Sequence, residues 1–344
     1  MNENPNIYDL THDDLVTCMR EIGQKAYRAR QLLNWLYEKR IGNFEEMTNI
    51  PSKFREHIEG SFSILLPVII KEMSSEDGSR KFLLELADGA LIESVLIPHD
   101  ERNTLCISSQ VGCRLGCKFC ATAVMGFKRD LHPGEITGQF LTIERQLGIS
   151  IDNIVVMGMG EPLDNLENLL KAMDIFTHPE ALAMSPRRIT VSTAGIPEAM
   201  LQLKHKFPRL GLSLSLNAAD PHLRRELMPI EETHPTAELI AAIGKINPGP
   251  QDPVTIEYVL LKGINDSPED AMKLCKLFEG IDNVKVNLIA FNPYGNIPYE
   301  CPSRNAVERF QSNIRRKGIE CFIRRSAGRD ISAACGQLIS ELNP

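Results

Sequence analysis

Six short apolar segments, each followed by a stretch long enough for a helix, constrain the fold of this chain more than any other feature. They are TLCIS at 104–108, NIVVMG at 153–158, RITVS at 188–192, GLSLSL at 211–216, VTIEYVLL at 254–261 and VKVNLIAF at 284–291. Strands that alternate with helices are typical of parallel βα units. The pattern therefore predicts an α/β fold, a partial (βα)6 barrel, with its chemistry at the carboxyl ends of the strands.

The chain before this array has two different patterns. A helical pattern with apolar residues on one face comes first, and Thr11 with Asp14 forms a capping-box-like start to it. The segments LPVIIKEM, RKFLLEL and ALIESVLIP follow, and Ala-Asp-Gly between the last two is a hairpin signal. We therefore predict an N-terminal helical domain, a β-hairpin linker region and a barrel with a C-terminal catalytic extension, at 1–62, 63–99 and 100–344.

Three cysteines directly follow the first strand of the array. Cys113, Cys117 and Cys120 have the spacing C-x3-C-x2-C. A closed zinc site takes four ligands, so a zinc site here would need a fourth such as Cys106. A [4Fe-4S] cluster held by three thiolates keeps one iron open to a small molecule. The spacing resembles the signature of radical S-adenosylmethionine (SAM) enzymes, in which SAM binds that open iron.

Polar and glycine residues follow the later strands. The second strand runs into MGMGEP, where glycines allow close approach of a ligand and Glu161 can hold an ammonium group. Ser192, Ser215 with Asn217, and Asn292 end the third, fourth and sixth strands. Each residue alone is more typical of a cap or a turn, but together they predict a SAM-binding rim.

Composition and charge limit the class of protein. The chain has 344 residues, 43% of them apolar, and no apolar run long enough for a membrane span. Nine cysteines, three of them clustered, argue against a disulfide framework, and the N-terminus has no signal-peptide pattern. We therefore expect a cytoplasmic protein that does not engage membranes.

The net charge of −7 by itself argues against a nucleic-acid partner, but the charge is unevenly distributed. Residues 20–40 include six basic and two acidic residues, and residues 301–335 include eight basic and three acidic residues. These runs are either phosphate-binding patches or solvated helix faces. On the first interpretation, Lys25, Arg28 and Arg30 dock RNA.

Two further cysteines stand apart from the cluster loop. Cys106 lies within the first strand, and Cys335 lies in AACGQL close to several arginines, which suggests an accessible thiol with a lowered pKa. A lone cysteine is usually a small buried apolar residue. We assign that structural or incidental status to the remaining four, which are Cys18, Cys275, Cys301 and Cys321.

The whole chain resembles the RlmN family of radical SAM methyltransferases, which act on carbon 2 of an adenine in 23S ribosomal RNA and in some transfer RNAs. The matching segments are YRARQLLNWLY, FEEMTNIP, IESVLIP, TLCISSQVGCRLGCKFCATAVMGF, MGMGEPL, EYVLLKGIND, NLIAFNPYG and AACGQL. The resemblance implies that the three clustered cysteines bind a [4Fe-4S] cluster. It implies SAM contacts from Gly160, Glu161, Ser192, Ser215, Leu216, Asn217 and Asn292.

The resemblance also implies roles for three more residues: Cys335 is S-methylated, Cys106 is its partner thiol, and Glu93 is a proton acceptor. Two SAM molecules per turnover, an electron-donor protein and a monomeric enzyme are implied as well. Asn217 departs from the family, since many members have histidine there. The chain also ends soon after Cys335, without the basic tail of some relatives.

The chemistry of the substrate is consistent with a radical enzyme. Carbon 2 of adenine lies between two ring nitrogens and is electron-poor, so it cannot attack the methyl group of SAM as a nucleophile. A radical route through a methylated thiol avoids this difficulty. Two alternatives remain: methylation of carbon 8 of the same adenine, as in the related Cfr enzymes, and a zinc-dependent RNA-binding protein without catalysis.

Overall fold

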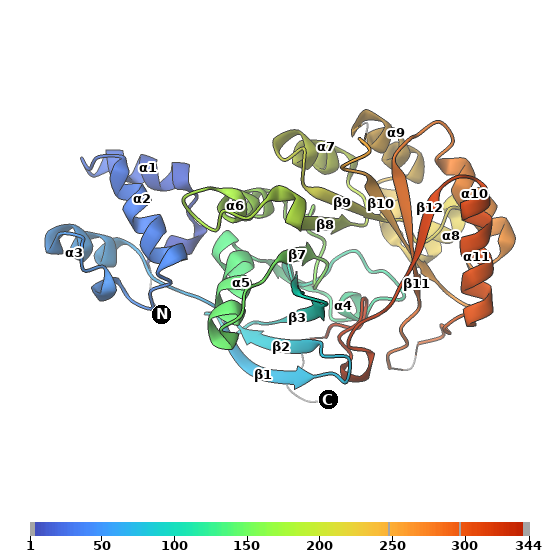
Figure 1. The fold of residues 1–344 in the computed structure, drawn as a ribbon, viewed down its shortest axis with the longest axis horizontal. Coiled ribbons are helices and arrows are strands. Elements are labelled where there is room, and N and C mark those ends of the chain that lie inside the picture. The colour runs from blue at the N-terminus through green and yellow to red at the C-terminus, as the bar shows by residue number, and fades with distance from the viewer. Residues whose placement is uncertain (1–3, 247, 296, 340–344) are drawn as a thin grey trace.

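The computed structural model describes residues 4–246, 248–295 and 297–339 (Figure 1). The N-terminal helices form a lobe beside one end of a large sheet. They are α1 (His12–Glu21), α2 (Tyr27–Leu33), which continues as a π-helical turn over Asn34–Glu38, and α3 (Ser52–Ser61). Thr11 and Asp14 form the predicted capping box at the start of α1. The buried apolar side chains of this lobe belong to the same cluster as those of the sheet and its helices.

The ten-stranded sheet has an antiparallel part and a parallel part, in the order β1-β2-β3-β4-β7-β8-β9-β10-β11-β12. Antiparallel pairing joins β1 (Val68–Ser74), β2 (Arg80–Glu85), β3 (Leu91–His99) and β4 (Arg102–Ile107). Parallel pairing joins β4 to β7 (Asn153–Val156), β8 (Ile189–Thr193), β9 (Gly211–Ser215), β10 (Val254–Leu260), β11 (Val284–Ala290) and β12 (Glu320–Arg324). The six predicted strands and the predicted hairpin between β2 and β3 are confirmed.

The seventh parallel strand, β12, was not predicted. Its sequence ECFIR is short, and only Cys321 within it is buried. An edge strand with one covered position has no run of apolar residues, so periodicity does not reveal it. Because β12 pairs only with β11, the barrel stays open, and the C-terminal segment lies near the antiparallel strands (Figure 1).

Helices follow the parallel strands and cover the outer face of the sheet. They are α5 (Pro133–Leu147), α6 (Leu166–Thr177), α7 (Pro197–Lys206), α8 (Pro221–Leu227), α9 (Thr236–Ile246), α10 (Pro268–Leu277) and α11 (Arg304–Arg316). Phe140 of α5 and Phe176 of α6 meet edge to face, with ring centroids 5.8 Å apart. None of the described helices combines the length and apolar character that crossing a bilayer requires.

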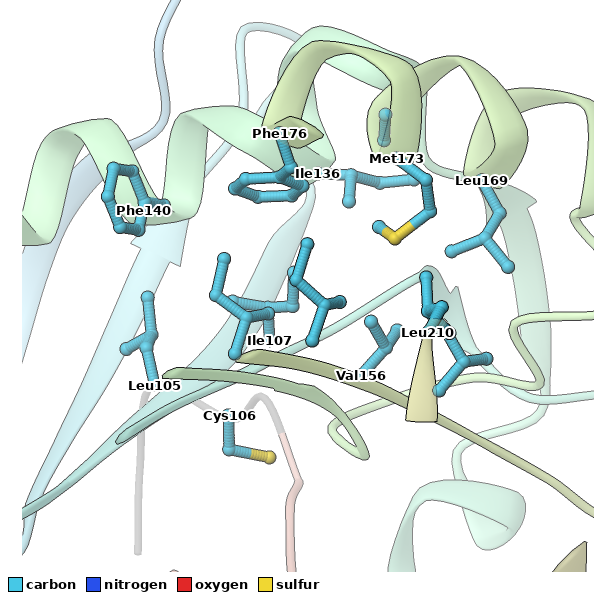
Figure 2. Packing of buried hydrophobic residues seen from close by; sticks show 14 of the residues in the cluster. Leu105, Cys106, Ile107, Ile136, Phe140, Val156, Leu169, Met173, Phe176 and Leu210 are labelled. Carbon is cyan, nitrogen blue, oxygen red and sulfur yellow. The ribbon is translucent and has the colours of Figure 1, made fainter. Parts of the chain in front are cut away.

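Strand β4 shows how the two faces of the sheet differ. Leu105 and Ile107 point into the apolar layer under α5 and α6, whereas Cys106 between them points to the opposite, inner face (Figure 2). Successive side chains of a strand alternate in direction, and Thr104 and Cys106, two residues apart, line the same inner cavity. The alternation places the Cys106 thiol on the face that carries the site.

Candidate active site

The cluster loop lies between two short paired strands, β5 (Gln110–Gly112) and β6 (Phe127–Asp130), with the short helix α4 (Ala121–Val124) inside it. Gly112 has φ +78°, and a Cβ there would lie 1.8 Å from the Gly126 carbonyl oxygen, so this close approach requires glycine. Cys113, Cys117 and Cys120 all line one cavity at the carboxyl ends of the parallel strands. The structure therefore brings the three predicted ligands together.

The three thiols have the chemistry of a metal-cluster site. Burial raises the pKa of each, that of Cys113 to about 12, and the neighbouring cluster thiols raise the pKa values of Cys113 and Cys117 further. Thiolates crowded in this way are stabilised by coordinated cations, which deprotonate a ligating thiol outright. Within the described residues, no group of three or more potential ligands is arranged around a single ion. The residues fit a cluster in which each thiolate binds a different iron.

The MGMGEP segment follows β7 and packs against the start of the cluster loop. Gly160 has φ +101°, and a Cβ there would lie 2.6 Å from the Gln110 Cβ. Glu161 next to it is buried, and its carboxylate accepts hydrogen bonds from Thr193 Oγ1 (2.6 Å), the Ala194 amide (2.7 Å) and the Leu163 amide (3.1 Å). Burial raises the pKa of Glu161 to about 7.

Glu161 lacks a cationic partner among the described residues. Its hydrogen bonds all come from neutral groups, and its side chain lines the same cavity as the three thiols. A buried carboxylate without a counter-ion favours binding of a cation, because the charge of that cation compensates for lost hydration. The arrangement fits the ammonium group of an amino-acid ligand.

The predicted rim residues divide into two groups. Ser192 and Ser215 line the cavity, and their hydroxyls lie 3.2 Å apart on neighbouring strands. Asn217 also lines it, but its Oδ1 accepts from the Val259 amide (2.9 Å) and its Nδ2 contacts the Met228 sulfur (3.2 Å). Its φ of +59° is left-handed, a conformation that asparagine tolerates better than most residues.

Leu216 and Asn292 do not line the cavity directly. Leu216 is completely buried in the apolar core. Asn292 lies after β11, and its Nδ2 donates to the Cys335 carbonyl (3.4 Å), while no atom of the described part of the chain hydrogen-bonds to its buried Oδ1. The structure therefore links Asn292 to the loop that carries Cys335.

The Cys335 loop is fastened to the cluster loop and to the end of β11. The Ala121 amide donates to the Gly336 carbonyl (2.7 Å), Thr122 Oγ1 to the Leu338 carbonyl (2.8 Å), and Gln337 Nε2 to the Pro293 carbonyl (2.8 Å). Cys335 lines the cluster cavity and also a second cavity, which Cys106 lines as well. Burial raises the pKa of Cys106 to about 12.

Glu93 lies on β3, on the antiparallel side of this loop, and lines a separate cavity. Its carboxylate is 3.0 Å from Lys81 Nζ and accepts from the Ile339 amide (3.0 Å). Burial raises the pKa of Glu93, and Lys81 opposes that rise. Lys81 Nζ also donates to the Ser332 carbonyl (3.3 Å), so this ion pair contacts the Cys335 loop at two points.

Four charged residues lie at or behind the site, and the sequence pointed only to Arg324, as one of the arginines near Cys335 along the chain. Glu257 on β10 and Arg324 on β12 both line the cluster cavity. Arg224 on α8 and Glu231 form a completely buried ion pair behind the rim. Glu257 does have a sequence signal, because it is one charge inside the apolar segment VTIEYVLL. Arg224 and Glu231 have none, since Arg224 contacts segments that are distant in sequence and Glu231 lies in an irregular segment.

The three basic residues of the N-terminal lobe differ in their surroundings. Lys25 is exposed, and Arg30 is exposed but 3.3 Å from Glu180. Arg28 lies over the rings of Tyr27 and Phe54, with its guanidinium carbon 5.0 and 5.5 Å from the ring centroids. RNA docking by these residues remains a prediction, in which Lys25 and Arg30 are the accessible charges.

Comparisons with known proteins agree with the geometry. A family profile described as "Radical SAM superfamily" matches residues 107–275, and one described as "Ribosomal RNA large subunit methyltransferase N-terminal domain" matches residues 5–64. The crystal structure of a radical SAM methyltransferase from Sphaerobacter thermophilus superposes with a TM-score of 0.91 at 38% identity, covering 98% of this chain and 100% of that one. Fold and site therefore define a radical SAM enzyme, a class that uses a [4Fe-4S] cluster and SAM.

Curated relatives narrow this class to a family. The dual-specificity RNA methyltransferase RlmN of a Nitratiruptor species is 44% identical, over 97% of each chain. The probable dual-specificity RNA methyltransferase RlmN of Thermosipho melanesiensis is also 44% identical, over 97% of this chain and 98% of that one. The chain belongs to the RlmN family of radical SAM RNA methyltransferases.

Proposed function

We propose that this protein methylates carbon 2 of a specific adenine in 23S ribosomal RNA and in some transfer RNAs, through a methyl group carried on Cys335. One observation supports this proposal most strongly: Cys335 lines both the cavity of the three cluster cysteines and the cavity of Cys106. A thiol in that position can receive a methyl group on one side and be attacked by a second thiol on the other.

The residues that would hold the cofactors follow from the geometry. Cys113, Cys117 and Cys120 would ligate the cluster, and the Glu161 carboxylate would bind the SAM ammonium group. Gly160, Ser192 and Ser215 would contact the remainder of SAM, and Asn217, Leu216 and Asn292 would shape the rim. When bound, the cluster and SAM supply the one-electron chemistry, including the 5′-deoxyadenosyl radical that removes a hydrogen atom from the methylated thiol.

The chain's own side chains would perform the remaining steps. The Cys335 thiolate would take a methyl group from a first SAM by displacement, and the radical chemistry that the cluster and a second SAM supply would then remove a hydrogen atom from that methyl group. The methylene radical left on the Cys335 sulfur would add to the adenine ring and tie the RNA covalently to the enzyme, and the ring adduct would then return one electron to the oxidised cluster. Glu93 accepts the ring proton, and Cys106 attacks the Cys335 sulfur, which breaks the sulfur–carbon bond and leaves a disulfide.

Each turnover therefore ends with the Cys106–Cys335 disulfide, which must be reduced again. An electron-donor protein that also reduces the cluster would complete the cycle. We propose that the enzyme acts as a monomer, because residues of a single chain already enclose the cavities that the cluster cysteines, Cys335 and Cys106 line.

The test compares Cys106→Ala and Cys335→Ala proteins purified from cells. Without Cys106 the reaction stops after the bond to RNA forms, so a protein–RNA crosslink should accumulate on denaturing gels. Without Cys335 no bond forms, so no crosslink should appear. A crosslink from neither variant, or from Cys335→Ala, would contradict these roles. Mass spectrometry of digested ribosomal and transfer RNA treated with the parent enzyme then identifies the methylated carbon, and methylation at carbon 8 would refute the carbon 2 assignment.

A further inference from the structure

Arg324 lines the two cavities that Cys335 also lines, and neither the family motifs nor the cluster chemistry assigns it a role. It is the last residue of β12, at the edge of the sheet. Among the described residues that line the cluster cavity, Arg324 is the only one with a cationic side chain. A single cationic side chain therefore lies in the cavity where Cys335 would take its methyl group, and the same side chain reaches the cavity that Cys106 lines.

The Arg324 guanidinium has few protein partners. Its Nη1 lies 3.7 Å from the Glu257 carboxylate and 3.5 Å from the Met157 sulfur, and within the described residues Nε and Nη2 donate to no protein atom. The Glu257 carboxylate accepts one hydrogen bond, from Asn287 Nδ2 to Oε1 (3.0 Å), and its buried Oε2 has no hydrogen-bond partner among the described residues. In contrast, three nitrogens of the Arg224 guanidinium donate hydrogen bonds to three different acceptors. A guanidinium carries five N–H donors, so Arg324 keeps most of them free for another group.

We propose that Arg324 supplies its charge to two thiols in turn, to Cys335 when that thiol takes the methyl group and to Cys106 when that thiol attacks the Cys335 sulfur. The inference rests on the proposed function, since it needs both thiols to react. Arg324 acts through these thiols and is therefore a positioning residue.

The electrostatics of the two thiols support this order. The charge of Cys335 is the largest influence that raises the pKa of Arg324, and Cys106 raises it as well. Burial and a charge on Cys335 both raise the pKa of Cys106, whereas Arg324 lowers it. Methylation turns Cys335 into a neutral thioether, so it removes one of the two influences that keep Cys106 protonated. The first reaction therefore prepares the second thiol.

Other charged groups face the same space and must be considered. His99 at the end of β3 and Arg325 beside Arg324 line the Cys106 cavity. Glu257 faces Arg324 from β10, and the charges of Cys335 and Cys120 influence each other. Arg325 is exposed, so its charge is screened by water, and Glu257 reduces the field of Arg324 without removing it.

Both steps balance in atoms and electrons. In the first, a lone pair of the Cys335 thiolate forms the sulfur–methyl bond while the methyl–sulfonium bond of SAM breaks, leaving a thioether and neutral S-adenosylhomocysteine. In the second, the Cys106 thiolate forms a bond to the Cys335 sulfur. The sulfur–carbon bond to the ring substituent breaks, its electron pair stays on that carbon, and the carbon takes up a proton. The reactive form is the thiolate in both cases.

The test measures the two steps separately on the full-length, cluster-loaded enzyme. Mass spectrometry follows methylation of Cys335 by SAM without RNA, and denaturing gels follow release of the crosslinked RNA, both between pH 6.5 and 9. The variants are Arg324→Gln and Arg324→Lys. Arg329→Gln is the matched control, because Arg329 is exposed and lines neither cavity.

The expected effect follows from loss of one nearby charge. An opposite charge within about 4–6 Å shifts a pKa by about 1–3 units. Each unit by which the pKa rises lowers the thiolate fraction tenfold and raises the nucleophilicity of the remaining thiolate about threefold. The reaction rate therefore falls about three- to fourfold per unit. Arg324→Gln should therefore slow the Cys106 step about three- to fortyfold, and this loss should persist from pH 6.5 to 9, because a thiol with a pKa of about 12 stays mostly protonated over that range. Methylation of Cys335 should also slow. Arg324→Lys should restore much of the rate, and Arg329→Gln should match the parent.

Two outcomes would overturn the inference: a loss in Arg324→Lys as large as the loss in Arg324→Gln, which indicates a structural role, or parent rates in both steps for Arg324→Gln. Should this variant fail to hold iron or to fold, Arg324→Lys decides, and a loss above tenfold despite its retained charge overturns the inference. A parent enzyme that never gains a methyl group on Cys335 refutes the proposed function itself.

Discussion

Replacing Arg224 by methionine should destabilise the barrel strongly, because it breaks a buried network that supports the SAM rim. Arg224 is completely buried; its Nη1 lies 2.5 Å from the Glu231 carboxylate, its Nη2 donates to the Ala194 carbonyl (2.6 Å), and its Nε donates to the Leu216 carbonyl (3.1 Å). The Ala194 amide in turn donates to Glu161. One guanidinium thus fixes the ends of β8 and β9, where the ligand-binding groups lie.

The magnitude can be worked out from these contacts. Removing one partner of a buried ion pair costs about 3–5 kcal/mol, since the other charge stays buried without compensation. Two carbonyls also lose their donor, at about 1–3 kcal/mol each for a buried unsatisfied group. These costs are not additive, so we expect the free energy of unfolding to fall by at least about 4 kcal/mol. Of its contacts with the described residues, the Glu231 carboxylate keeps those with Thr236 in the variant.

A double-mutant cycle separates the charge from the packing. Adding Glu231→Gln removes the unpaired carboxylate, so the double variant should recover at least about 2 kcal/mol relative to Arg224→Met alone. Urea unfolding under anaerobic conditions, followed by far-UV circular dichroism, measures the whole chain. Fluorescence of Trp35, the single tryptophan, reports on the N-terminal lobe. A loss below about 1 kcal/mol for the single variant, or a double variant no more stable than it, would refute the reasoning.

Three further predictions concern the cluster, the RNA and the proton acceptor. Cys117→Ala should abolish iron binding while the Trp35 unfolding signal stays unchanged. The control Cys301→Ala should retain about four irons per chain. A full iron complement in Cys117→Ala would contradict the assignment. Reversing the charges of Lys25 and Arg30 should weaken RNA binding at low salt without changing SAM cleavage in the absence of RNA, and equal affinities in filter binding would count against it. Lys81→Met should raise the pKa of Glu93, because Lys81 lowers it now, so fewer Glu93 side chains are ionised at neutral pH. Release of crosslinked RNA should then slow at pH 7 and recover as the pH rises, whereas an unchanged pH–rate profile would show that Glu93 is not the acceptor.

The local features of this chain follow directly from its sequence. The capping box at Thr11, the hairpin between β2 and β3 and the six apolar strands are confirmed, because caps, turns and short apolar runs depend on neighbouring residues. The cluster loop belongs to the same class, since three cysteines so close in sequence are close in any fold. The rule that chemistry follows parallel strands also places Glu161 and Ser192 at the site from the sequence alone.

Three-dimensional structure was needed where partners are distant in sequence. Whether Cys335 meets Cys106 depends on the path of the loop after β12, an edge strand without an apolar pattern. Arg224 and Glu231 read as ordinary surface charges, and their burial arises only when α8 folds behind the ends of β8 and β9. The Arg324–Glu257 pair spans two strands that are neighbours of β11 but far apart in the chain.

The sequence by itself therefore determined the class of chemistry, since the cluster spacing and the strand-end glycines are local patterns with few alternative uses. Tertiary structure decided which charges act on which thiols. Electrostatic interactions depend on burial and on distances of a few ångströms, and both arise only when the strand order is set. The same arginine can be a solvated surface charge or the one cation in a reaction cavity, and the position of β12 at the sheet edge makes Arg324 the latter among the residues that the structure describes.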